Sequence, residues 1–210
     1  GQFVISPTKV ELEMKPGDTD ALNNWGSALS EQGKIKSGEA ADALFSLSYE
    51  KFGAALSADP GIHEVLFNWG CALSDHADAK SGGAADALLR EACEKYEAAL
   101  KIKPDRRDAL NNWGSALSSQ AKSKTGAIAD SLFRRAYAKF EAALKIAPGN
   151  DDALNNWGVA LSRQAKIKSG DAADELFSAS YEKYEAALKT KPDKHEAFYN
   201  WGNALFSQAN

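Results

Sequence analysis

Tryptophan recurs at one fixed interval along this chain of 210 residues, and that interval constrains the fold more than any other feature. Neighbouring tryptophans are always 44 residues apart, at Trp25, Trp69, Trp113, Trp157 and Trp201. A glycine follows each of them directly, and a proline recurs with the same period. Periods of roughly 20 to 50 residues are typical of solenoids, in which each unit buries its apolar face against its neighbours. The sequence therefore predicts a row of similar structural units.

The apolar residues within one unit have helical spacing. In the first unit the run from Ala21 to Leu29 places them at i, i+1, i+4, i+7 and i+8, which predicts a helix over about residues 18–36. A second run with three and four spacing, from Leu44 to Leu56, predicts a helix over about residues 39–58. Each unit is therefore expected to be a pair of helices.

Recurring residues mark the ends of these helices. A glycine between the two helices of each unit is expected to take a positive φ, at Gly38, Gly82, Gly126 and Gly170. The residue before each glycine carries a hydroxyl that is expected to cap the helix, at Ser37, Ser81, Thr125 and Ser169. The recurring proline, Pro60 in the first unit, is expected to end the second helix.

This pattern resembles the tetratricopeptide repeat over nearly the whole chain. The segments that carry the resemblance are ALNNWGSALSEQG, from Ala21 to Gly33, and SYEKFGAALSADP, from Ser48 to Pro60. The resemblance implies an all-α protein, a right-handed α-solenoid of antiparallel helix hairpins with the first helix of each hairpin on the concave side. Because the family's unit has about 34 residues, the additional residues are expected at the turn between the helices, where they lengthen both helices and widen the groove.

The same period divides the chain into repeats. Four complete repeats are predicted at residues 17–60, 61–104, 105–148 and 149–192. Residues 1–16 are predicted to be the end of a truncated second helix, and residues 193–210 the first helix of a partial fifth repeat. The last helix carries apolar residues without a following helix to cover them, which fits either a fragment of a longer protein or open ends that dock head to tail.

An asparagine precedes every tryptophan, at Asn24, Asn68, Asn112, Asn156 and Asn200. One asparagine per repeat at one angular position forms a ladder along the groove. An amide offers both donors and acceptors, which match the N–H and C=O groups of an extended peptide. Tetratricopeptide proteins with such a ladder hold peptide backbone with it, and the resemblance implies the same role here. In the other interpretation these amides bond the neighbouring helix or face water.

Groove positions that differ between repeats are predicted to set specificity. Phe67 with Cys71 forms one candidate apolar pocket for an anchor side chain of a bound peptide, and Tyr199 with Val159 forms another. Asn203 belongs to the same set of varying positions. Drift on an unused surface explains this variation equally well.

Charge and composition narrow the function classes. The net charge of -4 gives no basic footprint, so no nucleic acid is expected as a partner. No apolar run approaches the ~18 residues that span a bilayer, so no membrane partner is expected and a cytoplasmic location is predicted. The three histidines and two cysteines show no nucleophile or metal-ligand pattern, so no catalytic residue, metal or cofactor is expected.

The sequence thus predicts a non-catalytic protein-interaction module that binds an extended segment of a protein partner in its asparagine-lined groove. Two alternatives belong to other classes. One is a structural spacer or scaffold that assembles head to tail through its open ends, and the other is a regulatory arm of a larger protein.

Overall fold

A computed structural model describes residues 18–209, and in this part of the chain nine α-helices follow one another without a strand. The first helices of the hairpins are α2 (Thr19–Lys34), α4 (His63–Asp78), α6 (Arg107–Ala121), α8 (Asp151–Ala165) and α10 (His195–Gln208). The second helices are α3 (Gly38–Ala58), α5 (Gly82–Ile102), α7 (Gly126–Ile146) and α9 (Asp171–Thr190). The truncated helix predicted for residues 1–16 lies outside the described residues.

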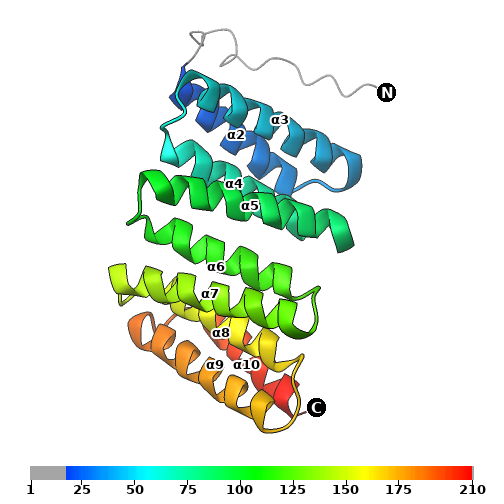
Figure 1. Ribbon diagram of the computed structural model, residues 1–210, viewed down its shortest axis with the longest axis vertical. Helices are drawn as coiled ribbons and strands as arrows, with labels where there is room; N and C mark the ends of the chain where they lie inside the picture. The colour runs from blue at the N-terminus through cyan, green and yellow to red at the C-terminus, as the bar shows by residue number, and fades with distance from the viewer. Residues whose placement is uncertain (1–17, 210) are drawn as a thin grey trace.

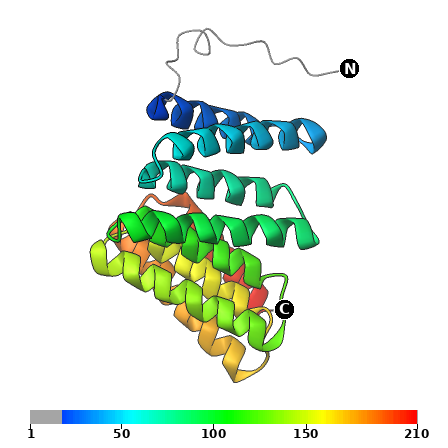
Figure 2. The ribbon, with the colours of Figure 1, turned by 45° about the horizontal axis from the view of Figure 1, so that its top comes forward.

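The helices pack as sequential antiparallel hairpins that stack along one axis, from α2 and α3 at one end to α9 and α10 at the other (Figure 1; Figure 2). Each first helix contacts the first helix of the next hairpin, whereas α3, α5, α7 and α9 do not contact one another. The stack therefore curves with the first helices on its inner, concave face. The predicted all-α solenoid of tetratricopeptide-like hairpins is confirmed.

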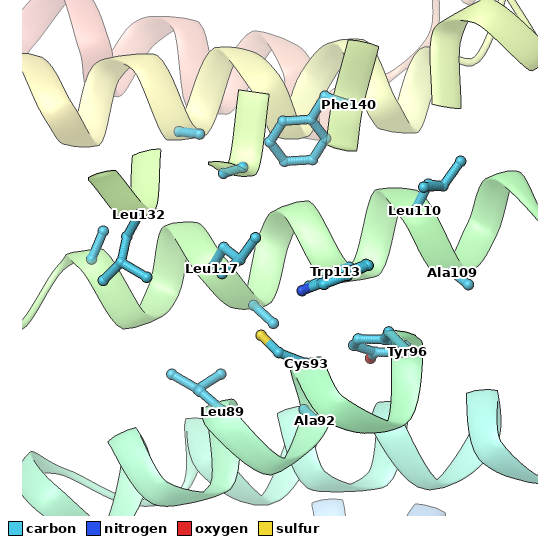
Figure 3. Packing of buried hydrophobic residues seen from close by; sticks show 14 of the residues in the cluster. Leu89, Ala92, Cys93, Tyr96, Ala109, Leu110, Trp113, Leu117, Leu132 and Phe140 are labelled. Carbon is cyan, nitrogen blue, oxygen red and sulfur yellow. The ribbon is translucent and has the colours of Figure 1, made fainter. Parts of the chain in front are cut away.

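The recurring Trp-Gly pair has a packing reason. A Cβ atom added to Gly114 would lie 2.7 Å from Cε1 of Phe140, so only glycine lets the ring of α7 rest on the backbone of α6. Gly26 meets Phe52 in the same way, also at 2.7 Å. These rings are fully buried, and the tryptophans beside the glycines pack between neighbouring repeats, as Trp113 does in the core (Figure 3). The period of the sequence is therefore a period of helix-to-helix contacts.

The helix boundaries agree with the prediction at the glycines and differ at the caps. Gly38, Gly82, Gly126 and Gly170 have φ between 56° and 60°, the left-handed region that glycine tolerates best. The hydroxyls of Ser37, Ser81 and Thr125 make no capping hydrogen bond, so that prediction is wrong. These residues hold an extended backbone at the start of the second helix. Side-chain caps occur instead on first helices, where Asp18 and Asn150 accept from the amides of Ala21 and Ala153.

The additional length of each repeat is helical. Only residues 35–37 separate α2 from α3. The second helix is the longer one, with 21 residues in α3 against 16 in α2. The inner face is therefore built from the shorter helices, and the longer ones support it from outside.

Candidate functional site

The predicted asparagine ladder lies on the inner helices and joins each repeat to the one before. Asn68 Nδ2 donates to Asn23 Oδ1 at 3.0 Å. Asn156 Nδ2 donates to Asn111 Oδ1, and Asn200 Nδ2 to Asn155 Oδ1, both at 3.1 Å. The double asparagine thus works as a pair across repeats, because the first residue of one repeat accepts from the second residue of the next.

Asn112 departs from this pattern because the preceding repeat offers no amide. Phe67 stands where the other repeats have the accepting asparagine, and Asn112 Nδ2 reaches the Cys71 sulfur at 3.3 Å instead. Asn112 Oδ1 accepts from Asn111 Nδ2 at 3.3 Å. An amide has two N–H donors, so one remains for a ligand at this rung. Contact of the ladder with a peptide stays a prediction.

A cavity of about 390 Å³ opens on the concave face beside Asn112. Its lining comes from α2, α4, α5 and α6, and it combines an apolar floor with polar walls. Cys71, Leu89 and Tyr96 form the floor, while Ser115 and Ser119 supply hydroxyls beside Asn112. This volume is in the range of small-molecule or single-side-chain sites. The cavity is therefore a place where a partner's side chain fits.

Three carboxylates line one wall of this cavity: Glu31, Asp75 and Asp78. Lys34 is the cation nearest to two of them, with its Nζ 3.2 Å from Glu31 Oε1 and 3.5 Å from Asp75 Oδ2. Burial raises the pKa of Asp75, and the charge of Lys34 opposes that rise. Since Asp75 is only partly solvated, a second cation placed in the cavity would stabilise its charged form. The wall is an acidic site that one lysine neutralises incompletely.

Asp78 also lines two neighbouring cavities. A cavity of about 320 Å³ lies between Asp78, Lys34 and Phe45. A cavity of about 340 Å³ extends from Asp78 towards Lys122 and Arg163. Burial lowers the pKa of Arg163, whose Nη1 donates to the hydroxyls of Ser118 and Ser119 at 3.3 Å. Acidic residues thus line the cavity over α2 and α4, and basic residues join them in the cavity towards α8.

The remaining predicted site residues are spread along the concave face. Cys71 lines the 390 Å³ cavity, whereas the Phe67 ring packs against Tyr96 with centroids 6.1 Å apart and lies under the Arg106 guanidinium. Val159 packs on the core around Tyr184. Tyr199 is 72% exposed on α10. Asn24 and Asn203 are exposed as well. The structure brings Cys71 and Asn112 together at one cavity, and Phe67 and Cys71 pack against the same core cluster.

Two residues of the acidic wall belong to the groove positions that vary between repeats and from which the sequence predicts specificity: Glu31 and Asp75 each fall six residues after a tryptophan. The sequence did not single out Asp78. Their sequence spacing does not show that carboxylates from two helices meet at Lys34. That meeting depends on how α2 and α4 stack.

The described residues hold no cluster of histidine, cysteine and carboxylate side chains suited to a metal ion. None of the helices in residues 18–209 combines the length and apolarity that crossing a membrane requires.

Comparison with known proteins places the chain in one family. The model of the family described as "Plant specific mitochondrial import receptor subunit TOM20" matches residues 64–153 and again residues 130–210, together more than half of the chain. No curated protein matches the sequence. The predicted cytoplasmic location is wrong, because the matched family is that of a mitochondrial import receptor subunit.

Solved structures agree on the fold. A crystal structure of MamA protein has a TM-score of 0.61 at 17% sequence identity, covering 91% of this chain and 82% of the other. A second MamA structure has a TM-score of 0.56 at 18% identity, with 85% of each chain covered. At these identities the likeness extends to the fold alone.

Proposed function

This chain belongs to the family of the plant-specific mitochondrial import receptor subunit TOM20, and on that premise we propose that it is a non-catalytic receptor module whose concave groove binds the targeting segment of an imported protein. Mitochondrial targeting segments are amphipathic, rich in arginine and serine, and poor in acidic residues. A groove suited to them needs carboxylates for the arginines and an apolar surface for the other face.

The observation that carries this proposal is the acidic wall beside the apolar floor of the 390 Å³ cavity. Glu31, Asp75 and Asp78 face the same space as Cys71 and Tyr96. An arginine fits a partly buried carboxylate better than a lysine does, because its planar guanidinium makes two parallel hydrogen bonds. Asp75, whose pKa burial raises, gains most from such a partner.

The ladder asparagines have a secondary role in this proposal. Each inter-repeat bond uses one N–H of the amide and leaves the other for the backbone of the bound segment. The proposed backbone contacts are Asn24, Asn68, Asn112, Asn156 and Asn200. Asn112 is the strongest candidate, because it lines the same cavity as the acidic wall.

Fluorescence anisotropy tests the proposal with a labelled amphipathic peptide that is rich in arginine and lacks acidic residues. Changing Glu31, Asp75 and Asp78 to their amides removes three ion pairs of roughly 0.5 kcal/mol each, so the affinity should fall about tenfold. The affinity of the wild-type chain should also fall as salt is added, since added ions screen these charges.

A matched control neutralises three exposed carboxylates on the outer helices, Glu50, Glu141 and Glu182. This control has the same net charge as the groove variant and should bind the peptide as the wild type does. Equal losses in both variants would show a nonspecific charge effect. Unchanged binding in the groove variant, with both variants equally helical, would refute the proposed site.

Self-association through α10 is a second candidate function. Phe198, Tyr199, Leu205 and Phe206 are all at least half exposed on this helix. Light scattering at increasing protein concentration tests it, because docking of one chain on the next predicts oligomers that grow with concentration.

A further inference from the structure

Three of the outer helices insert a tyrosine over the tryptophan of the following repeat. The rings of Tyr49, Tyr137 and Tyr181 each lie 6.2 Å, centroid to centroid, from the tryptophan they stack on. Their hydroxyls are held as well. Tyr137 and Tyr181 donate to the side-chain oxygens of Gln164 and Gln208 at 2.6 Å, and the Tyr49 hydroxyl lies 3.0 Å from His76 Nδ1.

Helix α5 lacks this ring. The equivalent residue, 44 positions after Tyr49, is Cys93, and the residue equivalent to Phe45 and Phe133 is Leu89. Two aromatic side chains are thus replaced by smaller ones in a single repeat. A cavity of about 570 Å³ lies there between α5 and α7, lined by Cys93, Trp113, Leu117 and Leu132. Figure 3 shows Cys93 below Trp113, with Leu89 and Leu132 to one side.

The tryptophan and the glutamine that contact the tyrosine in other repeats are both present in this cavity. Trp113 lines it, with Lys139 Nζ 3.6 Å from the ring centroid, as Lys95 lies over Trp69. Gln120 also lines it and stands at the position of Gln164 and Gln208. Within residues 18–209 no phenol reaches Gln120, because Cys93 replaces the tyrosine that would. The cavity keeps the tryptophan, which is 8% exposed, and the amide acceptor, without the phenol they bind in other repeats.

The rim of the cavity also departs from the other repeats. Ile128 is 64% exposed and lines the cavity. The equivalent residues of the other repeats are alanines, at Ala40, Ala84 and Ala172. An exposed isoleucine adds apolar surface at the mouth, where an arriving chain would bury it.

We infer that the cavity between α5 and α7 is a docking site for a tyrosine side chain of a partner protein. It lies on the outer helices, on the face opposite the concave groove, and is independent of the function proposed for that groove. Its ligand is identified by the molecule's own repeats, which show a phenol stacked on tryptophan with its hydroxyl on glutamine. The partner's tyrosine takes the place of the missing ring.

NMR of the full chain tests this site with N-acetyl-tyrosine amide as the probe, observed at the indole N–H of Trp113. A saturable shift with a dissociation constant on the order of 1 mM is expected. N-acetyl-phenylalanine amide should bind about fivefold more weakly, since it cannot donate to Gln120. Gln120→Leu should remove that difference. Equal binding of the two probes by the wild type would overturn the phenol assignment.

Two variants make the test specific. Cys93→Tyr restores the ring found in the other repeats and should abolish the shift. The double change Phe133→Leu and Tyr137→Cys copies the α5 residues into α7 and should create a second site that is observed at Trp157. Persistence of the Trp113 shift in a folded Cys93→Tyr chain would refute the site.

A second copy of the chain is the other source of a tyrosine, because Tyr199 is exposed. In that case the Trp113 signal would shift with protein concentration in the absence of probe, and Tyr199→Ala would remove this dependence. That result would show that the docked tyrosine comes from a second copy of the chain and not from a partner protein.

Discussion

The contact between Gly114 and the ring of Phe140 allows a sharp test of what the Trp-Gly repeat does. The change is Gly114→Ala, which adds one methyl group in the middle of α6. Its Cβ would lie 2.7 Å from Cε1 and 2.9 Å from Cδ1 of Phe140, whereas ordinary contacts of this kind are 3.4–4 Å. The ring is fully buried, so it must move by roughly 1 Å within a packed core.

The expected magnitude combines two opposing terms. Overpacking a core by one methyl group costs about 3 kcal/mol at the upper end of its range, which this rigid aromatic neighbour favours. Alanine gains about 1 kcal/mol over glycine in a helix interior. The net loss should be about 2 kcal/mol, which lowers the thermal midpoint by about 4–8 °C in a chain of this length.

Gly202→Ala is the matched control, since it makes the same change after the last tryptophan. Gly202 is exposed on α10, and an added Cβ there meets nothing within 4 Å. Only the helix-propensity term applies, so this variant should be more stable than the wild type by up to about 1 kcal/mol. Circular dichroism on thermal unfolding measures both variants. A Gly114→Ala chain as stable as Gly202→Ala would show that glycine is not required by the ring.

Two further predictions follow from the contacts between repeats. Asn156→Ala should lower the free energy of unfolding by about 1 kcal/mol, and Asn112→Ala should lower it by less. The reason is that Asn156 donates to an amide oxygen, whereas Asn112 donates to a thiol sulfur. Urea unfolding of both variants measures the difference, and equal losses would contradict the prediction. Lys194, which is 5% exposed, bridges Asp151 at 2.7 Å and Asp152 at 2.6 Å. Burial raises the pKa of Asp151, but the hydrogen bond to Lys194 and the charge of that lysine together lower it by more, so the pKa lies below its ordinary value. Its stabilising effect is therefore complete above the ordinary value of 3.8 and is lost as pH falls below it. Lys194→Met should thus lower the thermal midpoint at pH 7 and have a smaller effect at pH 3; an equal effect at both would contradict the ion pair.

Most of the fold was predictable because the same packing residues recur in every repeat. Trp25, Gly26 and an aromatic ring at the position of Phe52 recur as a set, so the helix pairs and their contacts are encoded locally and repeated. The caps were mispredicted because a hydroxyl beside a helix start looks the same whether or not it turns towards the amide. Ser37 holds an extended backbone there and leaves the bond unmade.

The candidate site was less predictable because it depends on distances between helices. The asparagine ladder was visible in the sequence, but its bonds to the preceding repeat needed the register of α4 against α2. The acidic wall needed the same register. Cys93 was visible as a free thiol and was not recognised as the absence of a tyrosine. Comparing each position with its copies 44 residues away would have found it.

Departures from the repeat gather in residues 61–104, and they change both faces of the solenoid. On the inner face Phe67 replaces an asparagine, and the amide of Asn112 bonds to Cys71 instead, at the cavity that Asp75 also lines. On the outer side Cys93 replaces a tyrosine, and a cavity lies beside Trp113. A unit that only supported the stack would keep the consensus residues, because each loss of ring volume weakens the core. On its outer side the second repeat forgoes that packing, which is the pattern expected where stability is exchanged for binding surface.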